Sequence, residues 1–173
     1  RAALVYERAQ FNGEQGNWPD LRTEQPGFMV SWCHGAPGIG LGRACLWGTD
    51  LWDERCEEEI TTAIHTTAAV NSIGADHVCC GSLGLMLVLQ LLTSGPWSMS
   101  RETHRIGQTA AEAWRDLAIA RCSEETLQLR CFRTMEGGIM LPGFFSGLSG
   151  MGMALLNSSA SQTLISAGLN QPQ

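Results

Sequence analysis

The sequence predicts an all-helical fold in which two layers of helices form a solenoid or a closed ring. Three observations support this prediction: a glycine motif that recurs along the chain, an apolar segment after each copy, and amphipathic segments between the copies. The motif reads X-X-G-x-x-G, and its copies are "CHGAPGIGLG" from Cys33, "CCGSLGLMLV" from Cys79 and "FSGLSGMGMA" from Phe145. Repeats of about 40 to 60 residues are typical of such helical arrays.

The apolar segments after the glycine motifs are expected to form the inner layer. The stretch from Leu83 to Leu92 is apolar on nearly all sides, and a helix of that kind is buried over most of its surface. Glycine also lets two backbones approach closely. Close packing alone therefore explains the third copy of the motif, where Phe145 and Ser146 offer no ligand chemistry.

The amphipathic segments are expected to form the outer layer. The first runs from Ala2 to Phe11. The second, from Asp53 to Val70, begins with acidic residues, which a helix N-terminus favours. The third, from Ser100 to Arg121, has Ser100 as its expected N-cap. No convincing strand pattern is present, and "LQLRCFRT" from Leu127 is expected to form a short strand or an irregular loop.

Length, charge and cysteine count narrow the class of protein. The chain has 173 residues, enough for one domain, and its net charge of −6 and pI near 5.1 argue against nucleic-acid binding. No apolar run reaches the roughly 18 residues of a membrane span, and no secretory signal opens the sequence. Because the first residue is Arg1, we expect a piece of a longer chain. Seven unevenly spaced cysteines do not suit a disulfide scaffold and indicate a reducing, cytoplasmic location.

Three cysteines are candidate metal ligands. Cys33 and Cys79 occupy the same position of their motifs, and Cys80 follows Cys79. If the inner helices are neighbours, their N-terminal turns converge and the sulfur atoms meet, where helix N-termini favour the thiolate form. Three protein ligands leave one position of Zn²⁺ open, as in catalytic sites. The spacing alone is a weak signal, and the alternative is that these cysteines are small buried hydrophobes.

The remaining cysteines and histidines carry weaker signals. No ligand role is expected for the cysteines that lack partners at ligand spacing, namely Cys45, Cys56, Cys122 and Cys131. His65 and His104 fall within expected helices and are interpreted as surface or core residues. His77 is a candidate for supporting the cysteines from behind. His34, next to Cys33, is a candidate ligand, general acid or base, or turn residue.

Four segments resemble a known family. They are "YERAQFNGEQGNWPDLR", "SWCHGAPGIGLGR", "DHVCCGSLG" and "LPGFFSGLSGMGMALL". In order and spacing they resemble the cyclase domain of class II lanthipeptide synthetases (the LanM type), which is related to the stand-alone LanC-like cyclases. The resemblance covers about residues 6–156, and residues 157–173 form a divergent tail. It implies an α,α-toroid of inner and outer helices, of which residues 1–173 are the C-terminal part.

The resemblance also implies a site and a reaction. Cys33, Cys79 and Cys80 become the ligands of Zn²⁺, with Cys80 where the commoner family pattern has histidine, as in a Cys-Cys-Gly branch. The implied reaction is the formation of lanthionine and methyllanthionine thioethers: a cysteine thiolate of a dehydrated precursor peptide adds to its dehydroalanine or dehydrobutyrine. His34 is then the candidate catalytic acid that protonates the α-carbon. The implied partners are the precursor peptide and a dehydratase domain of the same longer chain.

Two other functions remain open on the sequence. One is a non-catalytic zinc- or thiol-binding helical toroid of the LanC-like kind, and the other is a purely structural helical scaffold. Zinc content separates the scaffold from the rest, and turnover of a dehydrated peptide separates the enzyme from the binder. The isolated piece is expected to be inactive as a cyclase, because truncating a repeat array removes the interfaces between neighbouring repeats.

Overall fold

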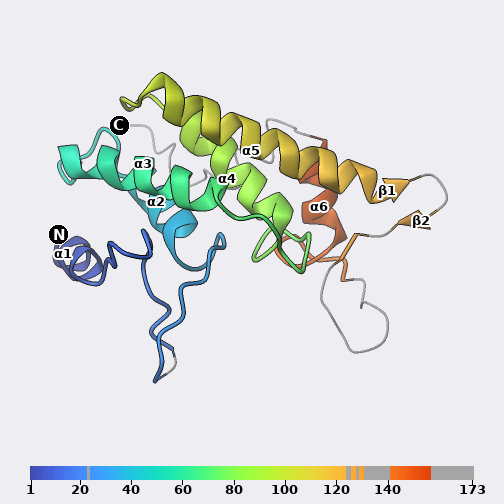
Figure 1. Ribbon diagram of the computed structural model, residues 1–173, viewed down its shortest axis with the longest axis horizontal. Coiled ribbons are helices and arrows are strands. Elements are labelled where there is room, and N and C mark those ends of the chain that lie inside the picture. The colour runs from blue at the N-terminus through green and yellow to red at the C-terminus, as the bar shows by residue number, and fades with distance from the viewer. Residues whose placement is uncertain (23, 124–125, 128, 131–140, 157–173) are drawn as a thin grey trace.

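The protein folds into six helices within the residues that its computed structural model describes, which are 1–22, 24–123, 126–127, 129–130 and 141–156 (Figure 1). The helices are α1 (Ala2–Ala9), α2 (Ala36–Ala44), α3 (Glu54–Ala68), α4 (Ser82–Ser94), α5 (Arg101–Ala120) and α6 (Leu148–Leu155). An antiparallel pair of two-residue strands, β1 (Cys122–Ser123) and β2 (Thr126–Leu127), follows α5. The predicted all-α class is confirmed.

The helices form two layers. The inner helices α2, α4 and α6 each follow a glycine motif, and α4 contacts both α2 and α6. The outer helices α3 and α5 lie side by side and pack over α2 and α4 respectively (Figure 1). Helix α3 therefore covers α2, and α5 covers α4, as the repeat pattern predicts.

Helix α4 forms the centre of the hydrophobic core. All of its leucines are buried except Leu91, which is half-buried, and Met86 and Val88 are buried among them. Burying one such side chain contributes about 1.5 to 3 kcal/mol. Helix α4 is therefore apolar on nearly all sides because it has neighbours on nearly all sides.

The outer helices α3 and α5 begin at capping residues, and Ser100, the cap of α5, is the one that the sequence predicted. The Asp53 carboxylate accepts a hydrogen bond of 3.2 Å from the N–H of Cys56, and Ser100 Oγ accepts one of 3.0 Å from the N–H of Thr103. Helix α1 ends at Ala9, earlier than expected, because the chain turns there to bring Trp18 beneath it. The Trp18 indole donates to the Glu7 carbonyl at 3.0 Å.

The second glycine of each motif is required by close backbone packing. A Cβ on this glycine would lie 2.5, 1.9 and 1.7 Å from the main-chain oxygen of the residue six positions earlier, in the pairs Gly38–Trp32, Gly84–Val78 and Gly150–Phe144. Real Cβ atoms do not approach oxygen so closely, so only glycine fits. The three turns are therefore built alike, and each fixes the residue that follows the packed carbonyl: Cys33, Cys79 and Phe145.

A buried ion-pair network joins α1, α2 and α3. Arg43, only 3% exposed, donates to Glu59 at 2.8 Å and to Glu7 at 2.6 Å. Arg8 donates to Glu59 at 3.1 Å and to Asp53 at 2.7 Å. The hydrogen bond to Asp53, followed by the bond to Glu59, raises the pKa of Arg8 above the ordinary range. The network holds α1, which buries none of its own residues, against the rest of the fold.

No described helix is long and apolar enough to cross a membrane.

Candidate metal centre

The structure brings the sulfur atoms of Cys33, Cys79 and Cys80 together. Cys33 lies in the turn before α2, and the other two lie in the turn before α4. The Sγ atoms of Cys33 and Cys80 are 3.2 Å apart, those of Cys79 and Cys80 are 3.4 Å apart, and all three lie within 4.8 Å of one another. We call these residues the cysteine cluster. Neighbouring inner helices with equivalent N-terminal turns produce it, as the sequence predicts.

Asn17 anchors the turn that carries Cys33. Its buried side chain accepts hydrogen bonds from the N–H groups of Trp18 at 2.8 Å and Ala36 at 2.7 Å. Its amide donates to the carbonyls of Phe28 and Met29 at 3.3 Å each. The amide therefore satisfies a free N–H at the start of α2 and ties the preceding loop to it. In the sequence, Asn17 lies in the segment "NWPDLR", where nothing but its polar side chain indicates such a role.

His77 supports the turn that carries the other two cysteines. The main-chain N–H of Cys80 donates to His77 Nδ1 at 3.2 Å, which places the ring proton on Nε2. Burial lowers the pKa of His77, and a hydrogen bond to the Phe145 carbonyl only partly opposes this effect. The ring is 1% exposed. The ring is therefore fixed beneath the turn of Cys79 and Cys80, a position compatible with the supporting role for which it was a candidate.

Asp76 fixes the same turn from the other side. This fully buried carboxylate accepts hydrogen bonds from Ser82 Oγ at 2.8 Å, from the N–H of Arg130 at 3.0 Å and from the guanidinium of Arg121. Burial would raise the pKa of Asp76, but these bonds, those from Arg130 above all, lower it below its usual value. Nothing in the sequence pattern marks this residue, because its two arginine partners lie 45 and 54 positions away.

The three thiols differ in acidity. Burial would raise the pKa of Cys33, but hydrogen bonds from Ser31, Cys80, Cys79 and His34 outweigh it and lower the pKa to about 7. Burial and the neighbouring Cys33 raise the pKa of Cys80 to about 12, and burial also raises that of Cys79. Cys33 is therefore the most acidic of the three thiols, and its charge opposes ionisation of the other two.

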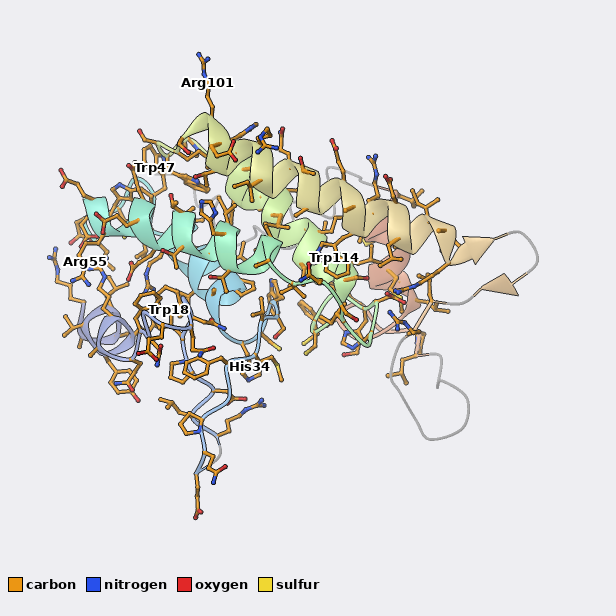
Figure 2. The ribbon with its side chains drawn as sticks, in the orientation of Figure 1. Trp18, His34, Trp47, Arg55, Arg101 and Trp114 are labelled. Atoms are coloured by element: carbon orange, nitrogen blue, oxygen red, sulfur yellow. The ribbon has the colours of Figure 1, made fainter. Side chains whose placement is uncertain are left out.

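His34 lies beside the cluster, on the lower side of the helical layers in Figure 2. Its Nδ1 is 3.0 Å from Cys33 Sγ, and its main chain exchanges two hydrogen bonds with Ser31, at 3.0 and 3.2 Å. When Cys33 is a thiolate, Nδ1–H is the donor and Nε2 remains for other partners. The ring is thus placed to contact a group that reacts next to Cys33.

The loop before the Cys33 turn carries a cationic side chain, Arg22, whose charge interacts with those of the cluster. Arg22 pairs with Asp20 through hydrogen bonds of 2.5 to 3.0 Å. The bond to Asp20 is the main cause that raises the pKa of Arg22, and the charges of Cys33 and Cys80 add to it. The guanidinium therefore lies within electrostatic reach of the sulfur atoms, and it is largely exposed. The sequence analysis gave it no role, although it falls in the quoted segment "NWPDLR".

The other cysteines and histidines lie outside the cluster. Cys56 is buried beside Asp53, Cys45 is exposed, and Cys122 is half-buried. His65 bonds Thr103 Oγ1 at 3.2 Å, and His104 is half-buried on α5. Cys131 lies outside the described residues. The ordinary roles expected for the five described side chains agree with these positions.

The donor set suits a soft metal ion. Two sulfur atoms bound to one tetrahedral zinc at about 2.3 Å lie about 3.8 Å apart. The separations of 3.2 Å between Cys33 and Cys80 and 3.4 Å between Cys79 and Cys80 are a few tenths of an ångström shorter than that value. Three thiols favour zinc over hard ions such as magnesium or calcium. Only three ligands come from the described chain, so a fourth position is left for a substrate or water.

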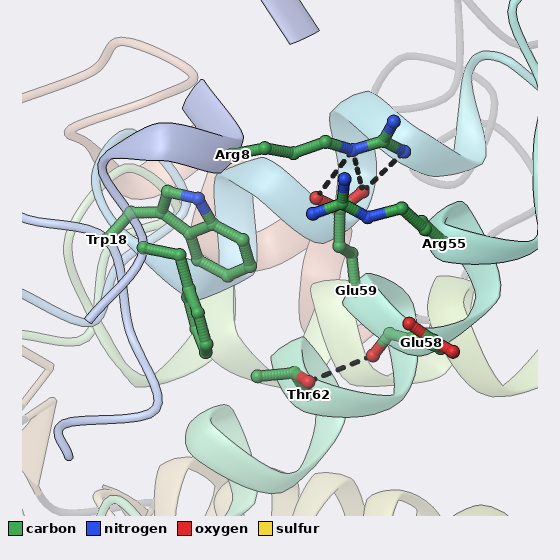
Figure 3. Close-up of a pocket in the computed structure, with 7 residues that line it drawn as sticks. Arg8, Trp18, Arg55, Glu58, Glu59 and Thr62 are labelled. Atoms are coloured by element: carbon green, nitrogen blue, oxygen red, sulfur yellow. Dashed lines mark hydrogen bonds and ion pairs between the residues drawn. The ribbon is translucent and has the colours of Figure 1, made fainter. Parts of the chain in front are cut away.

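A separate cavity of about 180 Å³ lies between α1 and α3 (Figure 3). Its walls are Arg8, Phe11, Trp18, Arg55, Glu58, Glu59 and Thr62. They include no cysteine or histidine, and Arg8 and Glu59 bond each other rather than facing a ligand (Figure 3). The chemistry of the molecule is therefore concentrated at the cysteine cluster and not in this cavity.

Fold and site together define a class of protein: a two-layer helical repeat with a cysteine cluster that could hold a metal at the N-terminal ends of its inner helices. A family model described as "Lanthionine synthetase C-like protein" matches residues 1–167. The chain belongs to this family, which includes lanthionine cyclases. No curated protein and no solved structure matches the chain.

Proposed function

We propose that this chain is the C-terminal part of the cyclase domain of a class II lanthipeptide synthetase (LanM type) of the Cys-Cys-Gly branch. Its reaction is zinc-dependent formation of lanthionine and methyllanthionine in a dehydrated precursor peptide. The observation that carries the proposal is the convergence of three thiols, from two turns 46 residues apart, in a chain of the lanthionine synthetase C-like family.

Cys33, Cys79 and Cys80 are the proposed ligands of the zinc ion. Bound zinc would supply a position at which the thiol of the peptide's cysteine is held as its thiolate at neutral pH. The hydrogen bonds that lower the pKa of Cys33 to about 7 favour the thiolate form that a metal ion binds. His77, through its bond to the Cys80 N–H, keeps the turn in place.

His34 is the proposed catalytic acid. When the peptide's thiolate adds to the β-carbon of dehydroalanine or dehydrobutyrine, a C–S bond forms, the C=C π bond breaks, and the α-carbon must take up one proton. His34 Nδ1 is 3.0 Å from Cys33 Sγ, so the proton would come from Nε2 of the imidazolium form, which carries a proton on each nitrogen and becomes the neutral Nδ1–H ring after the transfer. Arg22 is within electrostatic reach of the same region and favours negative charge there.

The proposed partners follow from this chemistry. The substrate is a precursor peptide that carries cysteine and dehydrated serine or threonine. The dehydrated residues are made by a dehydratase domain of the same longer chain. A reducing cytoplasm suits a cluster whose three thiols must stay unoxidised to bind metal.

The proposal is tested first by metal content. Wild type and the variants Cys33→Ala, Cys79→Ala and Cys80→Ala are purified in the full-length protein, and zinc per chain is measured by mass spectrometry. We expect one equivalent in wild type and a large loss in each variant. Cys45→Ala, which removes an exposed cysteine outside the cluster, is the matched control and keeps its zinc.

The second test is turnover. A synthetic peptide with one dehydroalanine and one cysteine is incubated with the zinc-loaded protein, and loss of the free thiol is followed by alkylation and mass spectrometry. Thioether formation above the uncatalysed rate supports the cyclase. If the protein binds zinc but does not accelerate thioether formation, the non-catalytic zinc- or thiol-binding function replaces the cyclase. If wild type and all cluster variants contain equal zinc, only the structural scaffold remains.

A further inference from the structure

Phe145 occupies the motif position that Cys33 and Cys79 occupy in the other two repeats. The three turns are built alike, so its side chain starts from the equivalent place at the same end of the inner helices. We propose that Phe145 is a specificity-determining residue: its ring forms a wall beside the cysteine cluster and binds an apolar or aromatic side chain next to the reacting cysteine of the peptide. This inference rests on the proposed function.

The main chain of Phe145 is bonded directly to the cluster. Its carbonyl accepts a hydrogen bond of 2.8 Å from the N–H of Cys79 and a second bond from the His77 ring. On the other side, Gly150 packs against the carbonyl of Phe144, where no Cβ would fit. The backbone that carries the ring is therefore held in a fixed position relative to the sulfur atoms.

The ring itself contacts one aromatic side chain of the turn that carries Cys33 and one of its own turn. Its centroid is 5.0 Å from that of Trp32, the residue before Cys33, at an angle of 31°. On a second side it contacts Phe144 edge-on at 5.1 Å. Even so, Phe145 remains 45% exposed. An aromatic ring that is clamped on two sides and open on the third offers a preorganised contact surface.

The chemistry of this wall selects the neighbour of the substrate cysteine. An aromatic partner stacks or packs edge-on against such a ring and gains about 0.5 to 1.5 kcal/mol beyond its burial, which corresponds to roughly a two- to tenfold gain in affinity. The cysteine cluster holds the thiol of the peptide's cysteine. The ring of Phe145 then distinguishes a peptide residue that has a side chain next to this cysteine from glycine, which has only a hydrogen. Glycine next to cysteine makes no use of it.

The experiment uses peptides that bind but cannot react. Acetyl-Gly-Cys-Gly-amide is compared with acetyl-Phe-Cys-Gly-amide and acetyl-Gly-Cys-Phe-amide by titration calorimetry on the zinc-loaded full-length protein. Wild type is expected to bind one of the phenylalanine peptides roughly two- to tenfold more tightly than the glycine peptide. Phe145→Ala is expected to lose this preference, and Phe145→Leu to keep part of it, while both retain the metal.

Trp47→Ala is the matched control. Trp47 is 44% exposed, close to the 45% of Phe145, and contacts Trp52 and Trp97 beyond the C-terminal ends of α2 and α4, away from the cluster. This variant should keep the full preference. The inference is overturned if wild type does not distinguish the peptides, if Phe145→Ala keeps the preference, or if Trp47→Ala loses it equally.

The proposed function fails by a different result. Binding of the glycine peptide and turnover of a dehydrated peptide report on the cyclase, whereas the preference for a phenylalanine neighbour reports on Phe145. If wild type prefers a phenylalanine peptide but forms no thioether, the proposed cyclase function is refuted and the proposed role of Phe145 in peptide binding is retained.

Discussion

The N–H of Cys80 donates a hydrogen bond of 3.2 Å to Nδ1 of His77, a fully buried ring. Because Nδ1 is the acceptor, the ring is held as the neutral Nε2–H tautomer, and burial lowers its pKa further in the same direction. One side chain thus fixes the turn that carries two of the three thiols. The role of His77 is to position the cysteines rather than to contact the substrate.

Replacement of His77 by alanine should weaken metal binding. Loss of the acceptor leaves the Cys80 N–H without its partner and frees the turn, and supporting residues of this kind typically change metal affinity by about 10- to 100-fold. Competition with a chromogenic chelator measures the effect. His104→Ala, on the half-buried surface of α5, is the control and should leave the affinity unchanged. Equal affinities in wild type and His77→Ala would contradict this role.

Replacement of His34 by alanine should separate metal binding from catalysis. We expect the zinc content to stay near that of wild type, because the three thiols remain. If His34 delivers the proton to the α-carbon, cyclisation should slow by about 10²-fold or more. Stopped assays on a dehydrated peptide, with zinc measured in the same samples, check both expectations. An unchanged rate would remove His34 from the mechanism and direct the search for the acid to other residues.

Replacement of Asp76 by asparagine should destabilise the protein in a pH-dependent manner. The folded-state pKa of Asp76 lies below the unfolded value of about 3.9, so its bonds contribute stability above about pH 4 that is lost as the pH falls towards the folded pKa. At pH 7 we expect a loss of about 2 to 4 kcal/mol, because Arg121 and Arg130 lose a buried charged partner.

Urea unfolding at pH 3 to 7, with a chelator present to remove the metal's own pH dependence, measures the difference between wild type and Asp76→Asn. The difference should shrink below about pH 4, where the wild-type carboxylate begins to take up its proton. A difference that is constant with pH, or that grows in acid, would show that the charge of Asp76 is not what stabilises the turn.

Two glycines of α6 should respond differently to alanine. A Cβ at Gly150 would lie 1.7 Å from the Phe144 carbonyl oxygen, whereas one at Gly152 meets nothing within 4 Å. Gly150→Ala must therefore push the turn away, and we expect a loss of about 2 kcal/mol or more. Gly152→Ala should be neutral or stabilise by up to about 1 kcal/mol, because alanine favours the helix. Thermal unfolding of both variants makes the comparison, and equal shifts would contradict the packing account.

Local sequence signals accounted for the helices and for the ligand candidates. The acidic start of α3, Ser100 before α5 and the apolar run of α4 each act within a few residues, and the structure has these helices close to the predicted bounds. The repeated offset of Cys33 and Cys79 placed thiols at equivalent turns. Whether these residues bind zinc is still a prediction, since the structure contributes only their proximity.

The residues that hold the site in place were not predictable from the pattern. Asn17 and Asp76 act through partners distant in sequence, and nothing local marks an asparagine or aspartate as buried. The interaction of Arg22 with the charges of Cys33 and Cys80, 11 and 58 positions away, likewise has no local signal in the sequence. Long-range hydrogen bonds of this kind depend on how the helices pack, which a linear motif does not encode.

The sequence by itself determined the all-helical repeat and the chemistry of its turns, because helix periodicity, capping and glycine packing are set by near neighbours. Only the tertiary structure decided that Cys33 Sγ lies 3.2 Å from Cys80 Sγ, and that the ring of Phe145 packs against Trp32, the residue before Cys33. These distances arise from the packing of α2 and α6 on either side of α4. That packing is a cooperative property of the whole core, so no single segment of the chain contains it.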